Sequence, residues 1–136
     1  RIVLKKVYKQ KIDFVDQKNL PNRDDEFLQE AIAIVEENLA NHELDKNDFA
    51  MKMNVSKSQL YKKLHHLTGL SPNEFVRNVR LKKAAYILSK GTNLQIAEIG
   101  FMVGFADPNY FSRKFKEFYG MTPSKYSLQH ANKEIL

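Results

Sequence analysis

Residues 96–126 read IAEIGFMVGFADPNYFSRKFKEFYGMTPSKY, and this stretch decides the fold. Asp107 and Pro108 are a cap and a first residue typical of the start of a helix. Phenylalanines then recur at helical spacing until Gly120, which is placed to end the helix. A shorter apolar helix precedes them and stops at Gly104. Two short helices joined by a tight turn predict a helix-turn-helix unit.

The same pattern occurs once before in the chain. Residues 49–88 read FAMKMNVSKSQLYKKLHHLTGLSPNEFVRNVRLKKAAYIL. A shift of 50 aligns the first helices and a shift of 51 aligns the second helices, so one extra residue is expected between turn and second helix. The pairs under the shift of 51 include Leu60 with Phe111, Lys62 with Arg113, Lys63 with Lys114, Gly69 with Gly120, and Pro72 with Pro123. The repeat predicts two helix-turn-helix units.

The remaining segments complete an all-α, seven-helix domain. An acidic amphipathic helix of about four turns is expected from Asp24, and a last short helix from Thr122, with the pattern fading after Leu128. The expected organisation is a basic connector over 1–23, a helical domain over 24–128 and a tail over 129–136. Within that domain we expect a first unit over about 24–70, a linker helix over about 72–89 and a second unit over about 93–128.

Composition excludes several classes of protein. Hydrophobic residues make up 43% of the 136 residues, which is enough for a core, and the absence of cysteine excludes disulfides and thiolate chemistry. No apolar run approaches the ~20 residues of a membrane span, so no membrane contact is expected for this segment. No phosphate-binding glycine loop, HExxH or GxSxG motif is present, so we expect no enzyme and no cofactor. The chain starts at Arg1, so we expect a piece of a longer protein.

Histidines do not predict a metal site. His65 and His66 are adjacent, so they point in different directions on a helix, and no third ligand follows at helical spacing. We therefore expect no metal.

Charge is distributed unevenly. The net charge is +6, made of +5 over residues 1–23, −8 over 24–48 and +9 over 49–126. A basic body following an acidic helix indicates a polyanionic partner, most often nucleic acid. The linker helix would span ~27 Å, close to the ~34 Å that separates successive major-groove segments on one face of DNA. Two recognition helices could then read adjacent segments of a site that need not be palindromic.

The two quoted stretches resemble the AraC/XylS family of bacterial transcription regulators, over residues 24–128. The resemblance implies seven helices, with two helix-turn-helix units on a central helix, and sequence-specific binding of double-stranded DNA. The basic lead-in and the phrase FLQEAIAIVEENL also resemble the C-terminal output domain of hybrid two-component regulators. That implies receiver and histidine kinase domains in the parent chain as partners, with RNA polymerase as another. It also implies a cytoplasmic location, within a parent that is either soluble or membrane-anchored.

The resemblance places base-reading residues near the start of each recognition helix. The repeat and the burial pattern agree, because Leu60, Leu64 and Leu67 must face the core and so turn the intervening positions outward. Arg113 could donate twice to guanine, and Asn109 could pair with adenine. The expected base-reading residues are Ser58, Tyr61, Lys62, Asn109, Ser112 and Arg113, although Tyr61 could instead lean on the edge of the core.

Other basic residues are candidates for phosphate, whose contacts position a protein without reading sequence. These are Lys57, Lys63 and Lys114. On the linker helix, one or two of Arg80, Lys82 and Lys83 could reach phosphate or pair with the acidic helix, and the sequence does not say which. Asp107 is expected to be a cap.

One departure from the family pattern is Gly100, where the family usually has alanine. Its repeat partner is Ala50, and two crossing helices need a small residue there. Glycine inside a helix costs up to ~1 kcal/mol relative to alanine. Two other functions stay open at this point: a helical protein-interaction module that does not bind DNA, and the DNA-binding fragment of a recombinase-type enzyme.

Overall fold

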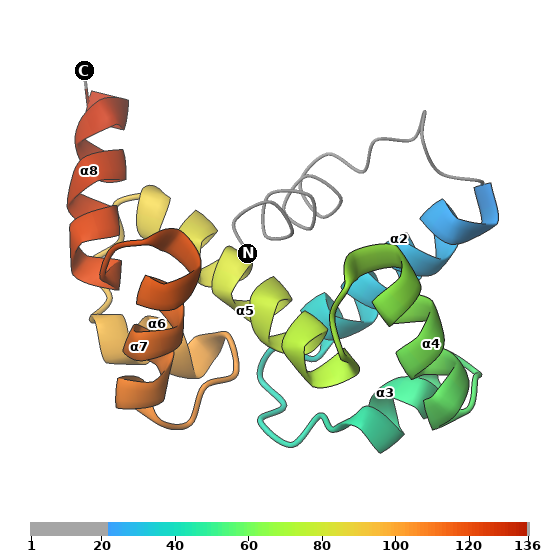
Figure 1. Cartoon of the computed structure of the whole chain (residues 1–136). Helices are drawn as coiled ribbons and strands as arrows, with labels where there is room; N and C mark the ends of the chain where they lie inside the picture. Colours follow the sequence, from blue (N-terminus) through green and yellow to red (C-terminus); the bar gives the residue numbers. More distant parts are fainter. Residues whose placement is uncertain (1–21, 136) are drawn as a thin grey trace. The chain divides into compact units, whose positions relative to one another are not determined.

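The computed structural model describes residues 22–135, and side chains from Arg23 to His130. These residues form seven helices and contain no strand, so the predicted all-α fold is confirmed (Figure 1). The expected basic connector lies outside the described residues, apart from its last two positions. The helices are α2 (Asn22–Glu37), α3 (Lys46–Lys52), α4 (Lys57–Thr68), α5 (Pro72–Ser89), α6 (Ile96–Met102), α7 (Pro108–Tyr119) and α8 (Pro123–Ile135).

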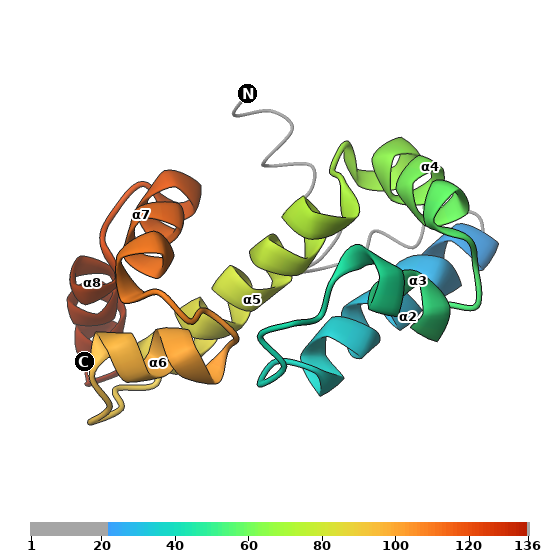
Figure 2. The ribbon, with the colours of Figure 1, turned by 90° about the horizontal axis from the view of Figure 1, so that it is seen from below.

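The described chain divides into two compact units. The first contains residues 22–38 and 43–79, and the second contains residues 39–42 and 80–135. The helix α5 therefore contributes its first half to one unit and its second half to the other, as its course in Figure 2 illustrates. Each unit has its own pair of short helices, α3 with α4 and α6 with α7.

Helix ends follow the sequence signals. The Ser56 hydroxyl accepts a hydrogen bond from the Gln59 amide at 3.1 Å, and the Gln59 side chain accepts one from the Ser56 amide at 2.9 Å. This reciprocal capping box starts α4. Gly69 ends α4 with a φ of 78°, and Gly120 ends α7 with a φ of 79°, which is left-handed backbone that favours glycine.

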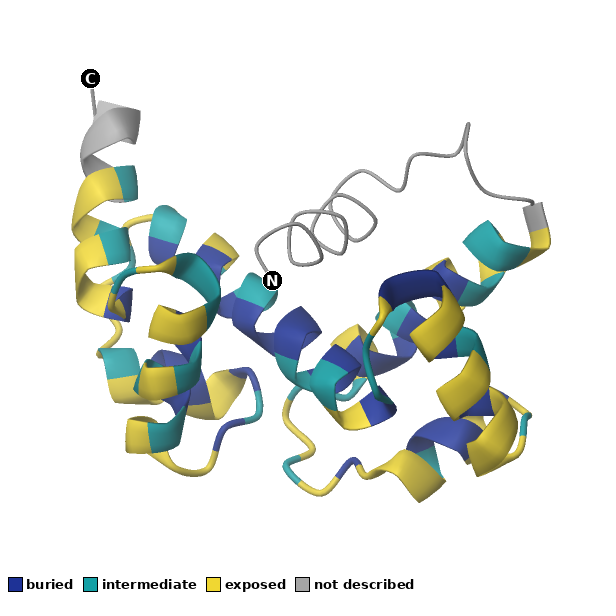
Figure 3. Cartoon of the chain, in the orientation of Figure 1, coloured by how far each residue is buried: buried dark blue, intermediate teal, exposed yellow. Residues whose placement is uncertain are grey.

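The core of the first unit collects one apolar face from each helix. Leu28, Phe49, Leu60 and Phe75 come from four different helices and are almost completely inaccessible. Figure 3 shows buried segments, in dark blue, along the helices of this unit. The rings of Phe49 and Phe75 lie 6.1 Å apart, within the range of attractive aromatic pairs. The buried stripe of α4 determines which of its side chains face solvent.

The core of the second unit is more aromatic. Phe111 and Phe115 from α7 are fully buried beside Leu88 and Ile99. The ring centre of Phe115 lies 4.7 Å from that of Tyr119 and 5.4 Å from that of Tyr126, against which it packs edge-on. These contacts anchor α7 against α5, α6 and the start of α8.

The two turns repeat each other at the level of single hydrogen bonds. The Val55 amide donates to the Ala50 carbonyl at 3.1 Å, and the Phe105 amide donates to the Gly100 carbonyl at 2.8 Å. These pairs differ by 50 positions, whereas the caps of the following helices differ by 51. The predicted extra residue is therefore Ala106, between the turn and α7.

A buried arginine holds the second turn. Arg80 on α5 is 5% exposed, and its guanidinium donates to the carbonyls of Leu39 at 2.6 Å, Val103 at 2.8 Å and Asn41 at 2.8 Å. The sequence predicted that one or two of Arg80, Lys82 and Lys83 reach phosphate or the acidic helix, and Arg80 instead directs its charge at main-chain oxygens inside the second unit. Burial lowers the pKa of this guanidinium, but an arginine still remains protonated. A Cβ on Gly104, whose φ is 110°, would lie 1.1 Å from Arg80 Nη1.

The last helix is longer than expected. α8 continues to Ile135, although its pattern was expected to fade after Leu128. No glycine or proline follows Pro123 to stop it. None of the described helices is both long and apolar enough to cross a bilayer.

Gly100 makes room for an aromatic ring. A Cβ at Gly100 would lie 2.6 Å from Cδ2 of Phe111, closer than real Cβ atoms approach. The first unit has Ala50 and Leu60 at the positions that correspond to Gly100 and Phe111. The second unit therefore combines the smaller helix residue with the larger buried side chain. The unit with glycine in its helix therefore obtains a larger buried side chain in exchange.

We expect Gly100→Ala to lower the free energy of unfolding by about 1–2 kcal/mol, because overpacking outweighs the gain in helix propensity. Urea denaturation would measure it. In a Phe111→Leu background, which imitates the first unit, the same change should cost less or even stabilise. Equal costs in the two backgrounds would contradict the assignment of Gly100 to the Phe111 ring.

Candidate nucleic-acid interface

The helix α4 presents polar residues opposite its buried stripe. Leu60 and Leu64 are fully buried, and this orientation leaves Ser58, Tyr61 and Lys62 exposed. Tyr61 is half exposed, and its ring lies parallel to the ring of His65, 5.6 Å away. Its ring therefore stacks within α4 itself, rather than on the edge of the core.

The helix α7 has the same arrangement. Phe111 and Phe115 are buried, Asn109 and Arg113 are exposed, and Ser112 is partly exposed. The Asp107 carboxylate accepts a hydrogen bond from the main-chain amide of Asn109 at 2.9 Å, so Asp107 is a helix cap as predicted. The structure therefore brings the three expected side chains of each helix to one solvent-facing side of that helix.

Two cations of α7 lie over an aromatic ring of the same helix. The guanidinium carbon of Arg113 lies 5.4 Å from the centre of the Tyr110 ring, and Lys114 Nζ lies 5.7 Å from it. Both distances are within the ~6 Å of a cation–π contact. Sequence analysis missed Tyr110, although its spacing of three and four residues from these cations was a readable signal.

Two of the three phosphate candidates have acidic partners in the chain. Lys63 Nζ lies 2.5 Å from the Asp24 carboxylate, with the two side chains 40% and 16% exposed. The hydrogen bond from Lys63 lowers the pKa of the Asp24 carboxyl below its ordinary value. Lys114 lies 3.3 Å from Glu117, while Lys57 is exposed at the first position of α4.

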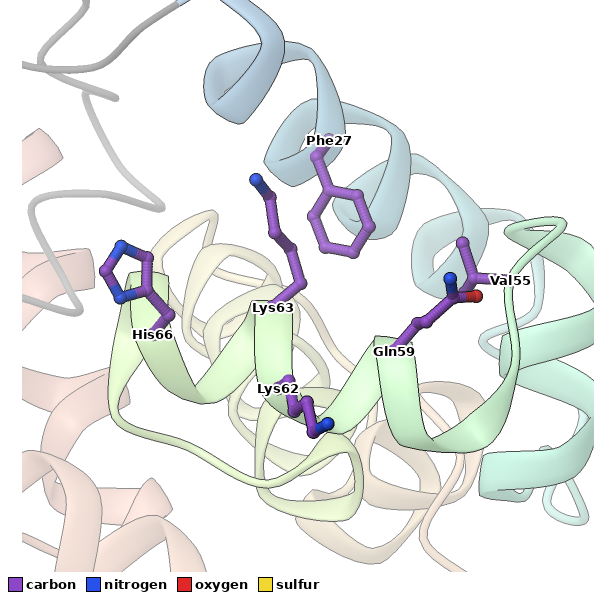
Figure 4. Close-up of a pocket in the computed structure, with 6 residues that line it drawn as sticks. All are labelled: Phe27, Val55, Gln59, Lys62, Lys63 and His66. Atoms are coloured by element: carbon purple, nitrogen blue, oxygen red, sulfur yellow. The ribbon is translucent and has the colours of Figure 1, made fainter.

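A shallow hollow lies between α2 and α4 (Figure 4). Lys63 extends across it toward α2 and places its amine 6.0 Å from the centre of the Phe27 ring, whereas Lys62 turns away from α2. The direction of Lys63 explains how it reaches Asp24. The hollow is lined by Phe27, Val55, Gln59, Lys62, Lys63 and His66.

Comparisons with known proteins agree with this geometry. A family of helix-turn-helix domains matches residues 49–129. A crystal structure of a transcriptional regulator from Chromobacterium violaceum, described as containing an AraC-type DNA-binding domain, superimposes with a TM-score of 0.73 at 27% identity, covering 82% of this chain and 97% of that one. The chain belongs to the AraC-type helix-turn-helix family.

Two further similarities concern the context of AraC-type domains. Histidine kinase P4 of Formosa agariphila is 37% identical over 108 residues, which are 79% of this chain and 8% of that protein. The C-terminal domain of the two-component response regulator yesN from Fusobacterium nucleatum has a TM-score of 0.63 at 31% identity, covering 74% of this chain and 97% of that one. This chain therefore spans a small part of the kinase that it resembles.

The charged side chains of α4 and α7 are mostly cations. Among the described side chains, no group of three histidine, aspartate or glutamate residues is placed to hold a metal. Apart from Glu117, which pairs with Lys114, the charged groups of α4 and α7 that face solvent are cations. This distribution suits an anionic partner more than a bound cation.

Proposed function

We propose that this AraC-type domain binds double-stranded DNA sequence-specifically and regulates transcription without catalysing a reaction. The observation that carries the proposal is the repeated helix surface. In both units a 12-residue helix buries one apolar stripe and exposes polar side chains at the same three repeat positions. A helix of this kind fits the major groove, where donors and acceptors distinguish all four base pairs.

The base-reading roles divide between α4 and α7. Arg113 donates two hydrogen bonds to guanine, Asn109 pairs with adenine, and Lys62 donates to a guanine edge. Ser58, Tyr61 and Ser112 complete the reading surface. Each helix reads one major-groove segment, and the segments are adjacent because both units lie in one chain.

The phosphate roles are proposed for Lys57, Lys63 and Lys114. Lys57 is available at the start of α4. Lys63 would have to exchange its contact with Asp24 for a phosphate, and Lys114 would have to leave Glu117. The Lys114–Glu117 pair is exposed and contributes little to stability, so Lys114 can leave it at little cost. The Lys63–Asp24 pair is partly buried, with Asp24 only 16% exposed, so the exchange at Lys63 costs more.

The parent protein is proposed to be a cytoplasmic or membrane-anchored two-component regulator with this domain, over residues 24–128, as its output. Similarity to a histidine kinase and to the C-terminal domain of a response regulator supports this context. Receiver and kinase domains would then supply the signal, and RNA polymerase would be the partner at the promoter.

Selection from a random DNA library tests the proposal. The full 136-residue chain would be incubated with duplexes containing 24 randomised base pairs, and bound duplexes would be sequenced and then titrated by fluorescence anisotropy. We expect one enriched sequence with two separated blocks of preference. Enrichment of no sequence would favour a protein-interaction module, and strand cleavage or joining would favour a recombinase fragment.

We expect Arg113→Ala to relax base preference at one position of the selected site, at a cost of ~1–3 kcal/mol. Lys57→Ala is the matched control, because it should weaken binding to the selected site and to random DNA by similar factors. Anisotropy titrations of both variants against every single-base variant of the site would measure this. Equal loss on selected and random DNA for Arg113→Ala would assign Arg113 to phosphate instead.

A further inference from the structure

The third residue of each recognition helix is where the two units differ. In α4 this residue is Gln59, whose side-chain oxygen accepts a hydrogen bond from the main-chain amide of Ser56 at 2.9 Å. This bond completes the capping box. In α7 the repeat position is Tyr110, which has no carbonyl to offer. The start of α7 is instead secured by Asp107 and by Pro108 at the first helical position. The side chain at this position is thereby released from capping.

The Tyr110 ring has cations above it and an aromatic neighbour. Arg113 and Lys114 lie three and four residues later, which places them on the same side of the helix. Their charged atoms lie 5.4 Å and 5.7 Å from the ring centre. The ring also packs against Phe105, 6.1 Å away, and is itself only partly exposed. Phe105 is buried, so the ring rests on a fixed part of the second unit.

An exposed arginine normally loses rotamer freedom when it binds, and this loss weakens the contact it makes. A ring that already holds the guanidinium reduces the loss. In the first unit the residue three before Lys62 is Gln59, which is engaged at the helix start. The two units therefore differ in how far their main base-reading cation is oriented before DNA arrives.

We propose that Tyr110 is a positioning residue that orients Arg113 for base reading, so that the second unit contributes more sequence discrimination than the first. This inference rests on the proposed DNA binding, in which Tyr110 would act through Arg113 and not by touching a base itself. The face of the ring carries the effect, and the phenolic hydroxyl does not contribute.

Two substitutions separate the ring from the helix start. Tyr110→Phe keeps the ring face and removes only the hydroxyl. Tyr110→Gln removes the ring and supplies the residue that the first unit uses at this position, so the helix start keeps a side chain suited to capping. The probes are the duplex selected by the wild-type chain and the same duplex changed at the base pair where Arg113→Ala relaxes preference.

We expect Tyr110→Gln to reduce the affinity ratio between these two duplexes about two- to fivefold, the effect of an exposed cation–π contact. Tyr110→Phe should keep the wild-type ratio. In an Arg113→Ala background, Tyr110→Gln should leave the ratio unchanged, since the group being positioned is gone. Without DNA, the Arg113 side-chain proton resonances should be shifted by the ring in the wild type and in Tyr110→Phe, and unshifted in Tyr110→Gln.

Three outcomes would overturn the inference while the wild type still selects a sequence. An unchanged ratio in Tyr110→Gln means that the ring does not orient Arg113. An equal loss in Tyr110→Phe means that the hydroxyl itself contacts DNA. A loss that persists without Arg113 means that the ring acts by another route. Failure of the wild-type chain to select any sequence would instead overturn the proposed function, and the inference with it.

Discussion

Arg80→Met is expected to lower the free energy of unfolding by about 3–5 kcal/mol. Methionine retains an apolar stem of similar length but donates no hydrogen bond. The carbonyls of Leu39, Val103 and Asn41 would then lose a charged donor, and two of these bonds are as short as 2.6 Å and 2.8 Å from the same nitrogen, Nη1. A buried polar group left without a partner costs its full desolvation. Urea denaturation followed by circular dichroism would give the difference.

Arg77→Met is the matched control for Arg80→Met. Arg77 lies one turn earlier on α5 and is partly exposed, so its replacement should cost less than about 1 kcal/mol. Arg80→Lys should recover little of the lost stability, because a single amine cannot reproduce the fork of a guanidinium. Similar costs for the Arg80 and Arg77 variants would show that the three carbonyl contacts contribute no net stability.

Local signals allowed the helices and their ends to be predicted. Ser56 and Gln59 are three residues apart, and Asp107 caps an amide two residues later. Both contacts join residues that lie within one helical turn of each other, so a short sequence window is enough to predict them. The repeat also located the inserted residue, Ala106, because the hydrogen bonds of the two turns depend on local backbone conformation. α5 begins at Pro72 and ends at Ser89, as its proline and its apolar pattern predicted.

Contacts between distant residues could not be predicted in the same way. Arg80 reaches Leu39 across 41 positions, and Lys63 reaches Asp24 across 39. In a sequence these cations are identical to cations that bind phosphate, since charge alone does not say which groups a fold brings near. The same limit applied to Gly100, whose small size was recognised but whose neighbour, the Phe111 ring, was not.

The candidate site falls between these two cases. The exposure of Lys62 and Arg113 followed from the burial of leucines and phenylalanines on the opposite side of each helix, which is a matter of helical period. Their contacts with bases stay predictions. Tyr110 was overlooked because an aromatic residue in a helix suggests core, whereas this ring is only partly buried and supports two cations.

Binding to the selected duplex is expected to weaken about 40-fold or more between 50 and 200 mM salt. Each phosphate that the protein neutralises releases counterions, and the slope of log K against log salt is about −0.9 per contact. The three proposed contacts, Lys57, Lys63 and Lys114, therefore set a minimum slope of about −2.7. The net charge of +9 over residues 49–126 overstates the contacts, because Arg80 within it is buried against carbonyls.

Single substitutions connect this slope to particular lysines. Lys57→Ala should make the slope shallower by about one, whereas Lys90→Ala, in the turn just after α5 and outside both α4 and α7, should leave it unchanged. Lys63→Ala should change the slope by a similar amount but cost less affinity than Lys57→Ala, since a phosphate that binds Lys63 must first displace Asp24, 2.5 Å away. Anisotropy titrations at four salt concentrations would resolve these slopes. A wild-type binding constant that stays flat across this range would rule out the phosphate contacts, and with them DNA as the partner of these two helices.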